Sequence, residues 1–152
     1  MGLYLNPNAE AFQMGLNTEI YVDKSLILSE LNKLVSSQGN FVCLSRPRRF
    51  GKSMAGNMIS AYYSKGCDTR DVFSQMKLGQ EPCFDKHLNK FNVIKLDLNG
   101  WYQRAIQRNR KELLLTDIHE TLVDEFKVAF PALSFCSGET LRSEEHTSEL
   151  QS

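Results

Sequence analysis

The residues best suited to chemistry lie between Ser45 and Ser53, where the sequence reads SRPRRFGKS. The end of this segment fits the phosphate-binding pattern G-x-x-x-x-G-K-[ST], with Arg46 in the place of the first glycine. Gly51 lets a backbone approach phosphate oxygens, and Lys52 can reach the β- and γ-phosphates. Ser53 can offer an oxygen to Mg²⁺, which takes few protein ligands. The segment therefore predicts a nucleotide-binding loop.

A basic surface turn is the alternative interpretation of the same residues. In that case Pro47 would shape the turn, and Lys52 would be solvated at the start of a helix. A cation at a helix N-terminus is unfavourable against the helix dipole unless an anion accompanies it. This cost favours the phosphate-binding interpretation.

The elements next to the loop should place it between a strand and a helix. Asn40 to Ser45 is a short apolar run, which predicts a strand buried on both faces. From Lys52 onward the pattern predicts a helix that Gly66 ends. The apolar residues of this helix share one face and are Met54, Met58, Ala61 and Tyr62.

The rest of the chain continues this alternation and predicts an α/β fold with parallel strands. Such folds commonly bind ligands at the carboxyl ends of their strands. Before the predicted nucleotide-binding loop we expect a loop over residues 1–18, a short strand over 19–22 and a helix capped by Asp23 or Ser25 that ends near Gly39. After it we expect a brief helix from Asp68 and a loop with a short helix over 81–90. The chain should continue with a strand over 92–98 that Asn99 and Gly100 end, and with a long helix that has an apolar stripe from Ile106 to Phe130 and is ended by Pro131.

The composition narrows the class of protein. Of 152 residues, 41% are hydrophobic and 24% are charged, which suits one globular domain. No run reaches the roughly 18 apolar residues of a bilayer-spanning helix, and the N-terminus lacks the pattern of a signal peptide. Eighteen basic and eighteen acidic residues cancel, so no bulk attraction to nucleic acid or membrane is expected. Four cysteines without a CxxC pair favour a reducing cytoplasm, with the thiols as small buried groups.

Three segments together resemble the AAA-ATPase-like family of bacterial proteins. They are YVDKS at residues 21–25, LSRPRRFGKS at 44–53 and FDKHLNKFNVIKLDLNG at 84–100. The resemblance implies the N-terminal part of a P-loop NTPase three-layer fold, with ATP and magnesium as ligands and ATP hydrolysis as a conformational switch in the complete protein. It also implies a nuclease-like domain of the PD-(D/E)XK type further along the chain, and through it a nucleic acid partner.

Within this family an arginine at position 46 is typical, so the missing first glycine is not a defect. By the resemblance, the loop residues line the nucleotide, and Ser53 also binds magnesium. The nucleotide-binding residues expected in this way are Arg46, Pro47, Arg48, Arg49, Phe50, Gly51, Lys52 and Ser53.

The last eleven residues, RSEEHTSELQS, resemble a translated sequencing adapter, with a polar tail as the alternative. We therefore expect an N-terminal loop over residues 1–18, a partial P-loop domain over 19–141 and a non-native tail over 142–152. The resemblance places the acidic motif needed for hydrolysis beyond Leu141, so the fragment should be inactive as an ATPase. The two predicted strands should not pair with each other, because the segments between them belong later in the chain.

Several residues and functions keep two interpretations. Asp97 either orients magnesium or is a strand-end residue near the site, and we favour the second. By resemblance Asp23 and Lys24 lie near the base or ribose, although Asp23 also suits a helix cap. His87 and His119 have no further ligand at metal spacing, so no zinc site is expected. A nucleic-acid-binding module using the RPRR loop and a small-molecule phosphotransferase are the alternative functions.

Overall fold

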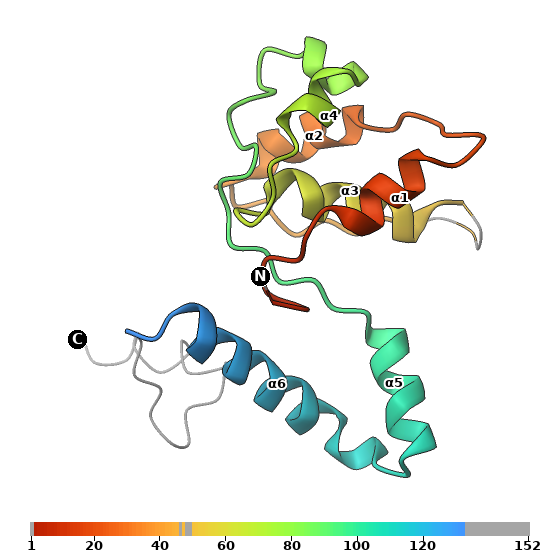
Figure 1. The fold of residues 1–152 in the computed structure, drawn as a ribbon, viewed down its shortest axis with the longest axis vertical. Coiled ribbons are helices and arrows are strands. Elements are labelled where there is room, and N and C mark those ends of the chain that lie inside the picture. Colours follow the sequence, from red (N-terminus) through yellow and green to blue (C-terminus); the bar gives the residue numbers. More distant parts are fainter. Residues whose placement is uncertain (1, 46, 48–49, 133–152) are drawn as a thin grey trace. The chain divides into compact units, whose positions relative to one another are not determined.

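The computed structural model describes residues 2–45, 47 and 50–132 (Figure 1). The described chain forms two compact units. Residues 6–95 make the first unit, and residues 2–5 make the second together with those from Leu96 onward. The helices of the first unit are α1 (Glu10–Leu16), α2 (Leu26–Leu34), α3 (Lys52–Tyr63), α4 (Arg70–Ser74) and the 3-10 helix η1 (Lys77–Gln80). Those of the second are α5 (Leu98–Gln107), the 3-10 helix η2 (Lys111–Leu113) and α6 (Leu114–Ala129).

The predicted α/β fold with parallel strands is wrong for the described residues. Helices account for 52% of the structure and strand-like bridges for only 3%, with no sheet. The bridge between Ser64 and Phe91 is parallel but isolated, so it does not extend into a strand. The three-layer P-loop arrangement therefore does not form in this part of the chain, and a helical scaffold carries the loop before α3.

The first predicted strand, over residues 40–45, is an irregular connection between α2 and α3. Two of its apolar side chains lie in solvent, with Phe41 96% exposed and Val42 53% exposed. A strand buried on both faces needs neighbouring strands to pair its backbone and layers to cover its side chains. The described chain supplies neither, so the apolar run alone does not produce a strand.

The second predicted strand, over residues 92–98, is also absent. The backbone N–H of Asn6 donates to the Val93 carbonyl at 2.7 Å, and the Val93 N–H donates to the Asn6 side-chain oxygen at 2.8 Å. Asn6, far away in the sequence, thus satisfies the N–H and the C=O of Val93, which a sheet would have paired with another strand. Further along, Leu98 begins α5, because the Asp97 carboxylate accepts the N–H of Gly100 at 3.1 Å and caps the helix. Neither predicted strand forms, so no pairing occurs between them.

The N-terminal segment, expected to be a loop through residue 18, contains the seven-residue helix α1. Phe12 on this helix is fully buried and stacks on Phe73, with ring centroids 5.3 Å apart. In Figure 1, α1 lies beside α3, and the two helices are in contact. The short strand expected over 19–22 is absent, and Ile20 and Val22 are exposed there.

Three of the predicted helices of the first unit are confirmed, whereas the short helix expected over 81–90 does not form, and η1 lies just before that segment. α2 follows the period read from the sequence, although it ends at Leu34 rather than near Gly39. α3 begins at Lys52, and its inward face carries Met58, Ala61 and Tyr62, each no more than 2% exposed. The brief helix after Asp68 is α4, which buries Phe73 completely. The core of this unit is built from the inward faces of α1 to α4 and from Leu78, Phe84 and Leu88.

Asn89 caps the C-terminal end of α3. Its side-chain N–H₂ group donates to the carbonyls of Ala61 and Ser64 at 3.0 and 3.1 Å, and its oxygen accepts the N–H of Thr69 at 3.2 Å. The Asn89 backbone has φ of 52°, a left-handed conformation that asparagine tolerates better than most residues. These bonds satisfy carbonyls that the end of a helix leaves without a partner.

The second unit packs α5 against α6 around Tyr4, Ile118 and Leu122, with Trp101 partly buried beside them. Tyr4 is held by the Glu125 carboxylate of α6, which accepts backbone N–H groups from Leu3, Tyr4 and Leu5. The N-terminal residues are thereby fixed to a helix more than a hundred positions later in the sequence.

The single long helix expected up to Phe130 is interrupted between α5 and α6. Asn109 adopts a left-handed conformation with φ of 53° directly after α5. Its N–H donates to Ile106, and the next N–H, of Arg110, donates to Ala105, which is the bond pattern of a Schellman motif. α6 itself ends at Ala129, two residues before Pro131, as the sequence predicts.

Cys43, Cys67 and Cys83 are free thiols. Cys43 is exposed, so the expectation that the cysteines are buried is wrong for this residue, whereas burial raises the pKa of Cys67. Cys136 lies outside the described residues. Across residues 2–45, 47 and 50–132, no helix has both the length and the apolar character needed to cross a bilayer.

Candidate phosphate-binding site at the start of α3

Gly51 is the residue from which the candidate site is built. It is the N-cap of α3 and adopts a left-handed conformation with φ of 76° and ψ of 25°. The Ala55 N–H donates to the Gly51 carbonyl at 2.9 Å, which closes the first turn of the helix. A Cβ atom at this position would meet only the Lys24 ammonium, at 3.6 Å. Glycine is therefore required by its backbone conformation and not by lack of space.

Lys52 and Ser53 follow as the first two residues of α3, and both are exposed. The first N–H groups of a helix have no partner within the helix, and the helix dipole favours negative charge beside them. The structure thus places an ammonium, a hydroxyl and the backbone of a helix start together, as the sequence predicts. These are the donors that a phosphate group requires.

Ser53 is the residue expected to bind magnesium. Its hydroxyl lies on an exposed first turn, and it lines neither of the two cavities described below. A single hydroxyl with water and phosphate oxygens suits Mg²⁺, which keeps several waters when it binds protein. The donor set thus fits the ion. Within the described residues, no group of three or more His, Cys, Asp or Glu side chains could hold a metal.

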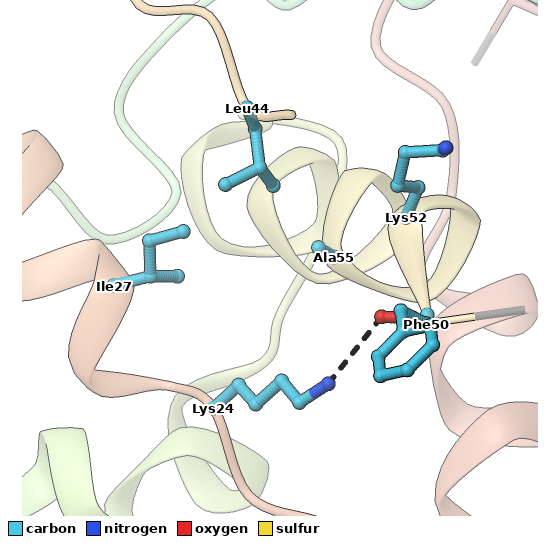
Figure 2. A pocket seen from close by; sticks show the side chains of 7 residues that line it. Lys24, Ile27, Leu44, Phe50, Lys52 and Ala55 are labelled. Atoms are coloured by element: carbon cyan, nitrogen blue, oxygen red, sulfur yellow. Dashed lines mark hydrogen bonds between the residues drawn. The ribbon is translucent and has the colours of Figure 1, made fainter. Parts of the chain in front are cut away.

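Lys24 lies beside the loop end from another part of the chain. It precedes α2, and its ammonium Nζ donates to the backbone carbonyl of Phe50 at 3.4 Å. Figure 2 shows the Lys24 side chain extended toward Phe50, whereas Lys52 projects from the start of α3 on the other side of Phe50. Two cationic side chains therefore flank the junction between Phe50 and Gly51.

Two cavities adjoin this junction, and Lys24, Phe50, Gly51 and Ala55 line both of them. The smaller one has a volume of about 230 Å³ and is completed by Ile27, Leu44 and Lys52 (Figure 2). The larger one, of about 460 Å³, is completed by Gly15, Thr18, Ile20, Tyr21, Val22, Met54 and Met58. Among these described lining residues there are two lysines and no Asp or Glu.

The wall of the larger cavity is the part of the site that the sequence analysis did not predict. Thr18, Ile20, Tyr21 and Val22 contribute four of its eleven described lining residues, and we had expected a strand over 19–22. Tyr21 belongs to this wall, and burial, followed by the charge of Asp23, raises the pKa of its hydroxyl. The hydroxyl therefore stays protonated at neutral pH. The YVDKS segment, already noted for its resemblance, was the signal that could have indicated this wall.

Asp23 is bound to backbone N–H groups. One carboxylate oxygen accepts the N–H of Ser25 at 2.8 Å, and the other accepts the N–H of Lys77 at 2.8 Å. Burial alone would raise the pKa of Asp23, but the Lys77 and Ser25 hydrogen bonds outweigh it and lower the pKa. Asp23 therefore binds the backbone just before α2 and that of Lys77, but it does not cap the helix, because the N-cap of α2 is Ser25 and no side chain makes a cap hydrogen bond there. Asp23 lines neither cavity.

The remaining sequence candidates have other positions. Asp97 caps α5 in the second unit, so its carboxylate is used in a helix cap there. His87 and His119 belong to no described metal-binding group. Pro47 is exposed, and its carbonyl lies 3.4 Å from the Phe50 N–H. Arg46, Arg48 and Arg49 lie outside the described residues.

A comparison with known protein families gives the class to which this site belongs. The model of the AAA-ATPase-like family, described as "Predicted AAA-ATPase", matches residues 11–150. The matched range includes the loop, α3 and every residue that lines the two cavities. The chain therefore belongs to the AAA-ATPase-like family. No curated protein and no solved structure matches it.

Proposed function

We propose that this chain binds ATP with Mg²⁺ at the start of α3. The observation that carries the proposal is the left-handed Gly51 at the N-cap of α3, followed at once by Lys52 and Ser53. This arrangement would offer a helix dipole, an ammonium and a hydroxyl to one anion. Membership of a family described as predicted ATPases supports a nucleotide as that anion.

The phosphates would lie at the backbone of Gly51 and the first turn of α3, with Lys52 as a point charge on the terminal phosphates. Ser53 would contribute its hydroxyl to the Mg²⁺ that the phosphates carry. The larger cavity would hold the base, because apolar side chains line most of it and Tyr21 offers an aromatic ring and a protonated hydroxyl. Its volume of about 460 Å³ falls within the range of small-molecule sites.

The described residues support nucleotide binding more than turnover. ATP hydrolysis needs a carboxylate that orients magnesium or the attacking water. Among the described residues that line the two cavities, none is Asp or Glu. We therefore propose that hydrolysis, acting as a conformational switch, needs an acid from outside these lining residues, and that the chain alone binds ATP without turning it over.

Calorimetric titration of the chain with ATP, with and without Mg²⁺, tests the proposal. ATP should bind more tightly than adenosine, because the phosphates supply the main contacts. Mg²⁺ should increase the affinity for ATP and leave the affinity for adenosine unchanged. Ser53→Ala should reduce the Mg²⁺ effect more than the affinity measured without the metal. No detectable ATP binding, or equal affinity for ATP and adenosine, would contradict the assignment.

A further inference from the structure

The charged residues around the smaller cavity suggest that a second side chain binds the phosphates. Lys24 and Lys52 come from separate parts of the chain, and both line this cavity, whose described lining residues include no Asp or Glu. Two cationic residues on the wall of one cavity create a positive potential, which attracts a polyanion more strongly than a single charge does. Lys52 belongs to the loop pattern, whereas Lys24 lies outside it.

Lys24 reaches the loop backbone itself. Its Nζ atom lies 3.4 Å from the Phe50 carbonyl and 3.6 Å from the point that a Gly51 Cβ would occupy. An ammonium has three N–H donors, and the bond to Phe50 uses one of them. Lys24 can therefore bind the loop and a phosphate oxygen at the same time.

The carboxylate next to Lys24 in sequence is bound to other groups. This acid is Asp23, and both of its oxygens are directed to the N–H groups of Ser25 and Lys77. No ion pair joins Lys24 to a carboxylate within the described residues. The Asp23 bonds instead fix the backbone from which Lys24 extends.

From this geometry we propose that Lys24 is a second phosphate-binding cation, which contacts the phosphate tail of the nucleotide and ties it to the Phe50 carbonyl. This inference rests on the proposed function and deepens it. It gives Lys24 a role at the phosphates, in contrast to the base or ribose. It also predicts that Lys24 contributes more to the binding affinity when the ligand carries more phosphates.

The test compares the affinities of Lys24→Met and wild-type chains for ATP, ADP and adenosine. Methionine keeps an unbranched apolar stem and removes the charge together with the N–H donors, including the bond to Phe50. Lys33→Met on α2 is the matched control, because its ammonium is exposed, pairs with Glu30 and lines neither cavity. Circular dichroism of each variant checks that the helices remain, and Lys24→Arg tests whether a restored charge restores binding.

We expect Lys24→Met to bind ATP about tenfold more weakly or worse, ADP less affected and adenosine unchanged, with Lys24→Arg recovering much of the loss. The loss should shrink at high salt, because the contact is between exposed charges. Unchanged ATP affinity in Lys24→Met, while Lys52→Ala loses binding, would overturn the role of Lys24 and leave the proposed function standing. An equal loss for ATP and adenosine would place Lys24 at the base and also overturn it. A wild-type chain that binds no nucleotide would refute the proposed function itself.

Discussion

Asp23 and Lys77 are joined by a hydrogen bond of 2.8 Å between residues 54 positions apart, from the N–H of Lys77 to the Asp23 carboxylate. The same carboxylate binds the N–H of Ser25, the N-cap of α2. Ser25 is fully buried, and its hydroxyl accepts the N–H of Leu78 at 3.1 Å. The start of α2 and the 3-10 helix η1 are thus connected through two adjacent polar contacts next to Lys24.

This connection should make folding stability depend on pH. The pKa of Asp23 is lowered in the folded chain, so its contribution to folding stability is complete above the ordinary pKa of an aspartate and is lost as the pH falls through the lower pKa of the folded state. Asp23→Asn should destabilise the chain by about 1 kcal/mol at pH 7, because the carboxylate is only partly buried. Urea unfolding of both proteins between pH 7 and pH 2 measures this. The difference in the free energy of unfolding between the wild type and Asp23→Asn should narrow at acid pH. A difference that stays constant over that range would contradict the role of the charge.

Gly51 provides a second prediction, with a control in the same helix. Gly51→Ala should destabilise the chain by about 1–2 kcal/mol, because an alanine must adopt a left-handed conformation there. Gly56, in the middle of α3, has open space around its Cβ position, so Gly56→Ala should stabilise by about 0.5–1 kcal/mol. Thermal unfolding of the two variants should shift in opposite directions. Equal shifts would show that Gly51 does not hold the conformation described.

Asn89 should be needed for the C-terminal end of α3. Asn89→Gly keeps the left-handed backbone accessible but removes the side-chain bonds to Ala61, Ser64 and Thr69. We expect a loss of about 1–3 kcal/mol, since the N–H of the buried Thr69 would lose its acceptor. The Ala61 and Ser64 carbonyls would keep bonds from the Thr69 hydroxyl and the Cys67 N–H. Chemical denaturation measures the loss, and hydrogen exchange should show faster exchange in the last turn of α3. If Asn89→Gly unfolded like the wild type, the capping role would be wrong.

The helices could be predicted from sequence because their determinants are local. The spacing of Met58, Ala61 and Tyr62 already indicates the buried face of α3, and the GKS sequence marks where that helix begins. The strands could not be predicted in this way. An apolar run such as residues 40–45 becomes a strand only if other segments pair with it, and in the described chain Phe41 and Val42 remain in solvent. α1 was missed because Phe12 is its single buried residue, too little for a periodic pattern.

In the candidate site, too, some residues could be placed from the local sequence and others could not. Gly51, Lys52 and Ser53 are consecutive, so their shared position follows from the sequence. Lys24 approaches Phe50 across 26 positions, and Asn89 reaches the end of α3 from at least 25 positions away. Contacts at such separations depend on tertiary packing, and no local pattern in the chain encodes them.

The most direct test of the account is the affinity of Lys52→Ala for a fluorescent ATP analogue. The matched control is Lys65→Ala, since Lys65 is exposed beyond the end of α3. We expect the wild type and Lys65→Ala to bind equally. Lys52→Ala should lose about 1.5–3 kcal/mol of binding free energy, more than tenfold in affinity, because a charge-assisted phosphate contact disappears. Unchanged affinity in a Lys52→Ala chain whose circular dichroism matches the wild type would contradict the phosphate-binding site at the start of α3.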